Sequence, residues 1–268
     1  MVRAADRTKR PARTSVWLED KARAERGGQP SGLDRARITA TAVRLLDAEG
    51  LAKFSMRRLA AELNVTAMSV YWYVDTKDDL LELALDQVFG ELRLPTEDAD
   101  EESDDGPGEH PDEDWRVQLR ALAAEYRGLL VRHPWVTPIF GTYLNIGPHA
   151  LGFSRAVQRV IRRTGLPVRG QAGALAAVFQ FVYGFGTIEG HFMERSAAAG
   201  MGPDAYFTEA MAAVTRAPRT GADEVIERSR TLMDARGGDT VTEMYERDFT
   251  MALDIVIAGI EAMVARPE

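Results

Sequence analysis

The four residues from Thr66 to Ser69 combine two hydroxyl groups with one small and one flexible apolar side chain. The hydroxyls of Thr66 and Ser69 can exchange hydrogen bonds with bases or phosphates, and Ala67 or Met68 can pack on a thymine methyl group. Arg57, in the preceding segment, can reach guanine or a phosphate. Together these residue types predict a surface that contacts DNA.

Tyr71, Tyr73 and Lys77 follow at the edge of this surface. Lys77 falls at the expected start of a helix, whose N-terminus adds its own partial positive charge. Such groups suit phosphate contacts, which give affinity and register rather than sequence preference. The alternative is that the aromatic residues here form only a hydrophobic core. Trp72 is expected to be buried, but Tyr71 and Tyr73 lie two residues apart and cannot both point inward.

The elements that must position these residues are short helices. Asp34, Ser55 and Thr66 are each expected to cap the N-terminus of a helix, and Gly50 ends the first one. Asn64 falls at the sharp turn between the second and third helices, because asparagine tolerates unusual backbone angles. Helix-turn-helix proteins place the second helix of such a pair in the major groove and touch base edges with its N-terminal residues.

The remainder of the chain also has the periodicity of helices, with no convincing strand and no sequence repeat. A connecting helix is expected from residue 75 to about residue 92, and prolines separate the later helices. These later helices are expected over residues 115–132, 135–145, 148–164, 168–195, 203–215, 221–235 and 240–265. The sequence therefore predicts an all-α fold, with a three-helix helix-turn-helix head and a larger all-helical domain.

Charge and composition divide the chain into four segments, which are an arm (1–33), a head with its connecting helix (34–93), an acidic loop (94–114) and a second domain (115–268). The net charge of −8 seems unsuited to DNA. Residues 1–37, however, carry ten Lys or Arg against five Asp or Glu, whereas residues 97–114 carry eleven acidic residues and no Lys or Arg. The acidity therefore belongs to the loop and does not argue against a DNA-binding head.

Neither of the two charged segments has the composition of a folded core. The basic arm is expected to lie on phosphates or in a minor groove through Arg23 and Arg26, or to act as a tail that gives only non-specific attraction. The acidic loop is expected to be a solvated spacer, and repulsion of DNA or competition for the arm are alternatives. EF-hand spacing is absent from it, so no metal site is expected.

Several classes of protein are excluded by what the sequence lacks. There is no cysteine, which rules out disulfides and thiolate metal sites and fits a reducing cytoplasm. No apolar run approaches the roughly 18 residues of a membrane helix, and the basic N-terminus has no apolar region behind it as a secretory signal would. A Gly-rich phosphate loop, GxSxG and HExxH are also missing. We therefore expect a cytoplasmic protein with no membrane contact, no catalytic residues, no metal and no cofactor.

Two long helices, expected over residues 168–195 and 240–265, carry apolar side chains on more than one side. A helix with two apolar stripes either lies buried in its own domain or presents one stripe to a partner. Gly184, Gly186 and Gly190 would allow another helix to approach closely. Two such helices from each of two subunits predict a four-helix dimer interface, and burial within a monomer is the alternative.

The run LDRARITATAVRLLDAEGLAKFSMRRLAAELNVTAMSVYWYVDTKDDLLELAL, residues 33–85, resembles the DNA-binding head of the tetracycline-repressor-type (TetR) transcriptional regulators along its whole length. The match includes Gly50, Arg57, residues 71–74 and Lys77, and the HPWV run at 133–136 resembles their C-terminal domain more weakly. The resemblance implies a homodimer that binds a palindromic double-stranded DNA operator, usually as a repressor, and is released by a small molecule. An activator, and a head that has lost DNA binding, are the alternatives.

The resemblance also implies which residues meet DNA. The family's base and phosphate contacts correspond to Arg57, Thr66, Ala67, Met68, Ser69, Tyr71, Tyr73 and Lys77. The tetracycline repressor itself has Gln, Pro and His where this chain has Ala67, Met68 and Tyr73, so the operator must differ. Its magnesium-tetracycline site does not transfer to this chain. Release is expected when effector favours a different spacing of the two recognition helices, transmitted through residues 77–93.

The effector pocket that this implies in residues 115–268 should be apolar, with a few polar groups. Gln180 stands within an apolar helix, where burying its amide without a partner would cost about 1–3 kcal/mol. For each histidine, the alternative is a purely structural group. The residues predicted to bind a flat, fairly hydrophobic effector are Phe140, Asn145, His149, Phe179, Gln180, Tyr183 and His191.

Overall fold

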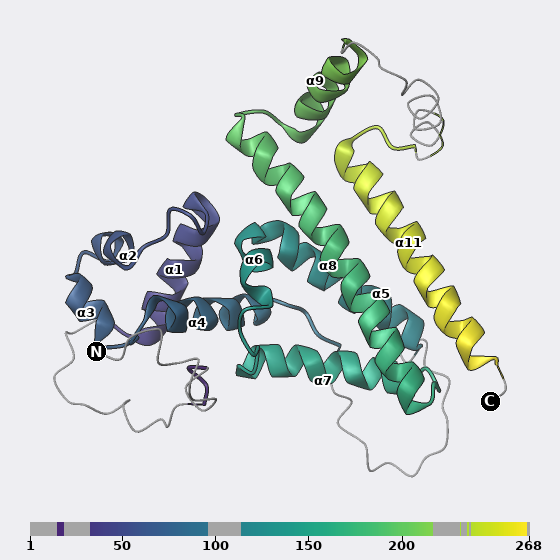
Figure 1. Ribbon diagram of the computed structural model, residues 1–268, viewed down its shortest axis with the longest axis horizontal. Coiled ribbons are helices and arrows are strands. Elements are labelled where there is room, and N and C mark those ends of the chain that lie inside the picture. Colours follow the sequence, from purple (N-terminus) through teal and green to yellow (C-terminus); the bar gives the residue numbers. More distant parts are fainter. Residues whose placement is uncertain are drawn as a thin grey trace. The chain divides into compact units, whose positions relative to one another are not determined.

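The computed structural model describes residues 15–18, 33–95, 114–216, 231, 235 and 237–266, and its regular elements within these ranges are helices (Figure 1). The predicted all-α fold is confirmed. The elements are α1 (Arg35–Glu49), α2 (Met56–Glu62), α3 (Ala67–Tyr71), α4 (Lys77–Phe89), α5 (Trp115–Arg132), the 3₁₀ turn η5 (Pro134–Val136), α6 (Thr137–Phe140), α7 (Pro148–Arg162), α8 (Val168–Ala198), α9 (Pro203–Arg216) and α11 (Val241–Val264).

The helix ends of the head follow local side-chain chemistry. Asp34, Ser55 and Thr66 each accept a hydrogen bond from a backbone N–H of the first turn, which satisfies a donor that the helix itself leaves unpaired. Asn64 adopts a φ of 55° at the turn between α2 and α3, and Gly50 adopts a φ of 77° after α1. The predicted caps, turn and stop are therefore confirmed.

Some predicted elements differ from the structure or lie outside the described residues. The helix expected over 135–145 is instead the short η5–α6 pair, which ends at Phe140 before Gly141 and is followed by Asn145 at a φ of 50°. The helix expected over 221–235 lies outside the described residues except at 231 and 235, and so does most of the acidic loop. Of the predicted arm, residues 15–18 and Leu33 are described.

The chain divides into two compact units that do not follow chain order. The first comprises residues 1–108 and 128–159, and the second comprises 109–127 and 160–268. Helix α6 and most of α7 thus fall in the first unit with the head. Phe89 of α4 packs with its ring centroid 6.0 Å from that of Phe140 and 5.6 Å from that of Phe153.

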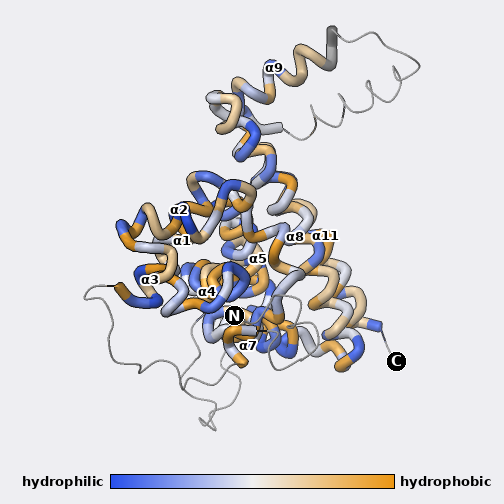
Figure 2. The backbone as a smooth tube through the Cα atoms, turned by 60° about the vertical axis from the view of Figure 1, so that its left-hand side comes forward, coloured by the Kyte–Doolittle hydropathy of each residue, from blue (hydrophilic) through white to orange (hydrophobic). Residues whose placement is uncertain are grey.

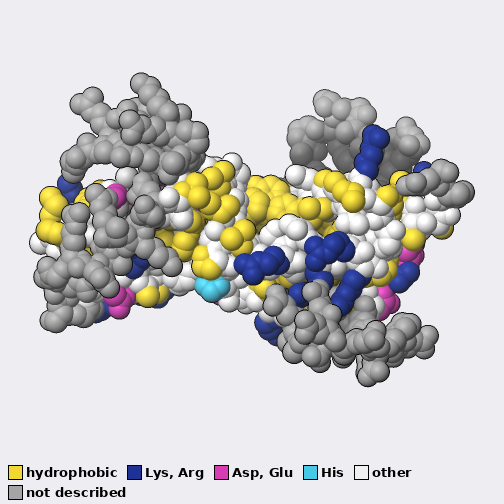
Figure 3. All heavy atoms as spheres, turned by 90° about the horizontal axis from the view of Figure 1, so that it is seen from below, with side chains coloured by type: hydrophobic (Ala, Val, Ile, Leu, Met, Phe, Trp, Pro, Cys, Tyr) yellow, Lys and Arg dark blue, Asp and Glu magenta, His cyan; other side chains and the backbone are white. Residues whose placement is uncertain are grey.

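Helix α7 shows a sharp division between its inner and outer faces. Ala156, Val157 and Val160 are buried, whereas Arg155 and Arg162 are exposed. Figure 3 views the molecule from below the view of Figure 1, and lysine and arginine side chains gather on part of the face that it shows. The arginines stay in water while the apolar stripe packs inward, as expected for an amphipathic helix.

Within the first unit, the His133 side chain contacts both α1 and Glu91, which follows α4. Its Nδ1 lies 2.7 Å from Asp47 Oδ1, its Nε2 lies 3.0 Å from Glu91 Oε2, and Trp135 Nε1 donates to the same Asp47 oxygen at 2.7 Å. Arg132 Nε lies 3.8 Å from Glu91. Burial alone would lower the pKa of His133, but the two carboxylates outweigh it, so its pKa is raised above its ordinary value.

This cluster predicts a pH dependence of stability. A histidine whose pKa is raised on folding contributes stability that is complete below its unfolded pKa, about 6.5, and is lost as pH rises through the folded value. We expect the free energy of unfolding to fall as pH rises above about 6.5 and through the raised pKa of folded His133, as measured by urea denaturation. His133→Gln should remove most of this slope, and an unchanged slope would show that other groups cause it.

The second unit is organised around α8 and α11, which run side by side (Figures 1 and 2). Phe249 of α11 packs against Phe181 and Phe185 of α8, with ring centroids 5.4 and 5.3 Å apart. Arg127 of α5 lies over the Phe249 ring and forms an ion pair with Glu189 at 2.7 Å, with both side chains buried. The core of this unit therefore encloses a charged pair within an aromatic cluster.

Candidate DNA interface

Helix α3 is held by a single buried side chain and leaves most of its surface open. Val70 is fully buried, whereas Met68 is 63% and Trp72 74% exposed. Met68 and the C-cap residue Trp72 are four positions apart, so they lie on one side of the helix, and exposed apolar side chains that lie together can mark an interaction surface. The predicted reading residues Thr66, Ala67, Met68 and Ser69 thus lie together on the first turn of an accessible helix.

The exposure of Trp72 corrects the prediction that it is buried. Trp72 follows Val70 by two residues, which is about 200° around a helix, so the two side chains face nearly opposite directions. The same two-residue spacing places Tyr71 and Tyr73 on different sides of the helix. Applied to Val70 and Trp72, it would have predicted from the sequence that Trp72 is exposed. Trp72 is therefore a candidate DNA-facing residue that the sequence analysis missed.

The hydroxyl groups of Thr66 and Ser69, in the first turn of α3, form a hydrogen bond with each other. Thr66 Oγ1 lies 2.9 Å from Ser69 Oγ and also accepts the Ser69 backbone N–H at 3.2 Å as the helix cap. This arrangement fixes the rotamers of both side chains before DNA arrives. A fixed pair of hydroxyls reduces the entropy lost on forming a contact with a base or phosphate.

Some arginine and lysine side chains of the head form ion pairs with its carboxylates, and others are exposed to solvent. Arg57 and Lys53 are exposed, as are Arg35 and Arg37 at the start of α1. Arg58, by contrast, contacts Glu49 at 2.7 Å and Glu62 at 3.0 Å. Arg57 therefore remains a candidate base or phosphate contact, and Lys53 joins it as a residue that sequence reasoning did not single out.

Lys77 and Tyr73, which were predicted to contact phosphates, make contacts within the head or are partly buried there. Lys77 Nζ donates to the Phe54 carbonyl at 2.9 Å and lies 5.5 Å from the centroid of the Phe54 ring. The Tyr73 hydroxyl is buried and has no hydrogen-bond partner among the described residues, while Tyr71 is half-exposed. Of the three predicted phosphate contacts, Tyr71 is the one whose surroundings are most open.

The predicted effector residues lie in different parts of the chain. Phe140, Asn145 and His149 belong to the first unit, and the four residues of α8 belong to the second. Within the first unit, Asn145 Nδ2 donates to the Phe140 carbonyl at 2.9 Å, and its Oδ1 is buried with no hydrogen-bond partner in the described part of the chain. His149 is exposed, with its ring beside Gly90.

On α8, two of the four predicted residues face the interior and two face outward. Phe179 stacks on Tyr126 of α5 with ring centroids 4.9 Å apart, and Tyr183 is half-buried. Gln180 and His191 are exposed. Gln180 therefore does not carry the cost of a buried, unpaired amide, because its position falls on the outward side of the helix.

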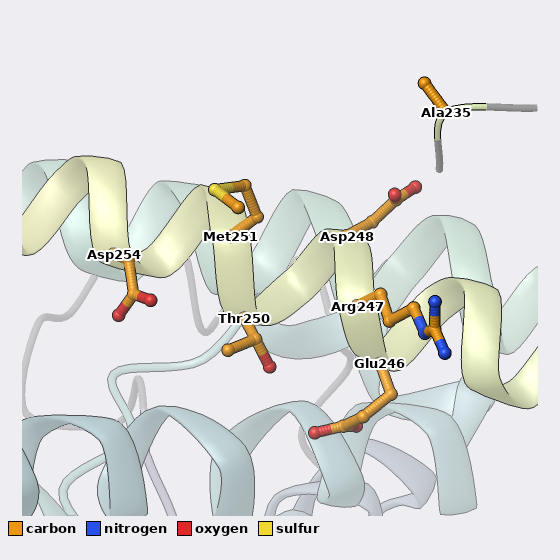
Figure 4. A pocket seen from close by; sticks show the side chains of 7 residues that line it. All are labelled: Ala235, Glu246, Arg247, Asp248, Thr250, Met251 and Asp254. Atoms are coloured by element: carbon orange, nitrogen blue, oxygen red, sulfur yellow. The ribbon is translucent and has the colours of Figure 1, made fainter. Parts of the chain in front are cut away.

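Two hollows of the second unit lie along α11. One, of about 660 Å³, lies between the first half of α8 and the last turns of α11 and is lined largely by small and apolar residues, including Gly173, Ala177 and Gly259. The other, of about 450 Å³, is lined by Glu246, Thr250 and Asp254, which point to one side of α11 in Figure 4, and by Ala235, Arg247, Asp248 and Met251. Neither of these two hollows is lined by a predicted effector residue.

Comparison with known proteins gives two matches to family models that together cover most of the chain. Residues 38–84 match the bacterial regulatory proteins of the tetR family, and residues 107–264 match the tetracyclin repressor-like C-terminal domain. The first match covers α2 and α3 with the parts of α1 and α4 that support them. The second covers the helices from α5 to α11.

Two curated relatives and one solved structure agree with this assignment. An HTH-type transcriptional regulator from Saccharopolyspora erythraea is 41% identical over 152 residues, which are 57% of this chain and 59% of that protein. The HTH-type transcriptional repressor DrrR1 from Streptomyces coeruleorubidus is 31% identical over 256 residues, 95% of this chain and 87% of that protein. ActR from Streptomyces coelicolor, solved in complex with actinorhodin, is 25% identical with a TM-score of 0.62, and the match covers 88% of this chain and all of that one.

The family matches, the identity to DrrR1 and the accessible helix α3 of a helix-turn-helix head all agree. The chain belongs to the tetR family of bacterial regulatory proteins and is a DNA-binding transcriptional regulator.

Proposed function

We propose that this protein is a repressor that binds a palindromic operator as a homodimer and leaves it when a small hydrophobic effector binds. The observation that carries the proposal is the open face of α3, with Met68 and Trp72 exposed beside the hydroxyls of Thr66 and Ser69. A helix of this kind fits the major groove and reads bases with its N-terminal residues. The relation to a named repressor supports repression over activation.

The homodimer is supported by the outward faces of α8 and α11. Ile188 is 66% and Ile255 67% exposed, and other large apolar side chains of the same two helices are also exposed: Val168, Met251, Met263 and Val264. Helix α8 is also long and apolar enough to cross a membrane by length and composition alone. Its buried Glu189, paired with Arg127, and its packing on α11 favour a helix that meets protein on both sides. A second copy of the same pair of helices would cover these faces.

The effector class is supported by relatives and by the aromatic interior of the second unit. ActR has been solved with actinorhodin and with (S)-DNPA, so a related chain holds organic ligands. Here the ring clusters around Phe179 and Phe249 supply apolar surface, and Tyr183 supplies a hydroxyl. Such surroundings favour a flat, mainly hydrophobic molecule with a few polar groups.

Selection of bound sequences from random duplex DNA tests this proposal. The full-length protein should enrich two inverted half-sites whose centres lie about 10 base pairs, or a multiple of this, apart. Adding an effector should reduce the amount of bound DNA without changing the enriched sequence. Enrichment of a single unsymmetrical site, or of none, would contradict the dimeric operator-binding model.

Trp72→Ala tests the interface on α3 directly. We expect about tenfold weaker binding to the selected operator, because an exposed tryptophan can lose contact area without disturbing the core. Fluorescence anisotropy of labelled operator measures the affinity, and thermal unfolding should remain within about 0.5 kcal/mol of the parent. Leu144→Ala, which changes another exposed apolar side chain outside α3, is the matched control and should bind as the parent does.

A further inference from the structure

Helix α4 begins shortly after α3 and carries three buried carboxylates, each less than 5% exposed: Asp79, Glu82 and Asp86. Glu82 accepts the hydroxyl of Ser15 and the backbone N–H of Val16. Asp86 accepts the backbone N–H of Ala150 at 2.9 Å. Neither a hydroxyl nor a backbone N–H loses its proton near neutral pH, so the donors of these contacts do not change with pH.

The segment that follows α4 is held differently, because it meets the ionisable ring of His133. Nε2 of the ring lies 3.0 Å from Glu91 Oε2, and Nδ1 lies 2.7 Å from Asp47 Oδ1. A neutral imidazole has one N–H donor and one acceptor nitrogen, whereas a carboxylate only accepts. Both contacts are therefore hydrogen bonds only when the ring carries two protons, as imidazolium.

Charged groups face this buried ring from three elements. Asp47 lies on α1, Glu91 follows α4, and Arg132 at the end of α5 has its Nε 3.8 Å from Glu91. The Asp47 oxygen also accepts Trp135 Nε1 of η5 at 2.7 Å, which holds that carboxylate in place. Loss of one proton should therefore leave the remaining N–H of His133 with Asp47. Glu91 is then released, because its side chain is 42% exposed and can turn to water or to Arg132.

We propose that proton uptake by His133 strengthens operator binding, because the imidazolium ties the segment after α4 to α1 of the DNA-binding head. Helix α1 packs against α4, and α4 follows α3 closely in the chain, so this bridge fixes two of the helices that support the recognition helix. The phosphates of DNA also favour a positive charge on the head. The proposal rests on operator binding by the head and assigns His133 and Glu91 as positioning residues.

The affinity for the selected operator, measured by fluorescence anisotropy at constant salt over a series of pH values, tests the proposal. The parent should bind with constant affinity below about pH 6.5 and about tenfold more weakly once the pH has passed the raised pKa of folded His133. His133→Gln cannot take up a proton, so its affinity should be nearly independent of pH. Titration calorimetry in buffers of different ionisation enthalpy should show proton uptake on binding by the parent and none by this variant.

Glu91→Gln is a second test, because its amide can donate to an unprotonated Nε2 of His133. It should also lose most of the pH dependence, and it replaces His133→Gln if that variant does not fold. Arg58→Gln is the matched control, since Arg58 contacts Glu49 of α1 at 2.7 Å through a cation that does not titrate near neutral pH. Any loss of affinity in this control should be equal at every pH.

The outcomes separate the positioning role from operator binding itself. Circular dichroism at each pH shows that the variants compared are folded. An affinity of the parent that does not change with pH, or a pH dependence that persists in His133→Gln and Glu91→Gln, would overturn the role of the bridge. If no operator is selected, or the parent does not bind it at any pH, operator binding fails instead.

Discussion

Replacing both Ile188 and Ile255 by arginine should produce a folded monomer that has lost tight operator binding. Both side chains are about two-thirds exposed within one chain, so the charges would meet water in the monomer and would be buried together only in the proposed dimer. Because a dimer binds two half-sites at once, the monomer should bind the selected operator about 10²–10⁴-fold more weakly. Light scattering reports the mass, and anisotropy reports the affinity.

The control for this result is an equivalent change elsewhere. Leu151→Arg on α7 alters an exposed apolar side chain outside α8 and α11, and it should remain dimeric with unchanged affinity. A double variant that stays dimeric at micromolar concentration would show that these faces are not the interface. Loss of the folded state, seen by circular dichroism, would show instead that the two isoleucines support the monomer.

Arg127→Ala should be among the most destabilising single changes in the second unit. Arg127 contacts both carboxylate oxygens of Glu189, at 2.7 and 3.0 Å, and Glu246 at 2.6 Å. Removing it leaves the Glu189 carboxylate buried without its cation, which costs about 3–5 kcal/mol. The free energy of unfolding in urea, followed by tyrosine and tryptophan fluorescence together with circular dichroism, measures the loss.

The same helix offers a matched control. Arg120 pairs with Asp254 at 2.9 Å, but both side chains are nearly half exposed, so Arg120→Ala should cost less than about 1 kcal/mol. Replacing Arg127 and Glu189 together by methionine should recover most of the stability, because no unpaired charge then remains. Similar losses for Arg127→Ala and Arg120→Ala would mean that the buried pair is not the source of the effect.

The head could be predicted from the sequence because its determinants are local. The caps at Asp34, Ser55 and Thr66 accept from N–H groups three residues further along the chain. The turn at Asn64 requires only a residue that tolerates a positive φ. The recognition helix was therefore located by a few neighbouring residues. The burial of Trp72 was predicted wrongly because aromatic character was given more weight than its angular position relative to Val70.

Features that depend on distant residues could not be predicted. Nothing near Gln180 in the chain shows which side of α8 faces α11, since both sides are apolar. Likewise, the grouping of α6 and α7 with the head depends on Phe89 meeting Phe140 and Phe153. The contact between Ser15 and Glu82 spans 67 positions and joins two residue types that are ordinarily exposed. The predicted DNA contacts and effector residues remain predictions for experiments on the protein.

The buried carboxylates of α4 have a consequence for how this helix can respond to any signal. Glu82 and Asp86 each face fixed N–H donors on other segments, and charge-assisted bonds weaken steeply once donor and acceptor separate. A small rotation of α4 would therefore break them rather than stretch them. Gly147 reinforces this, because a Cβ there would lie 2.2 Å from an Asp86 oxygen. Helix α4 should therefore occupy discrete positions, and its movement between them should be all-or-none rather than graded.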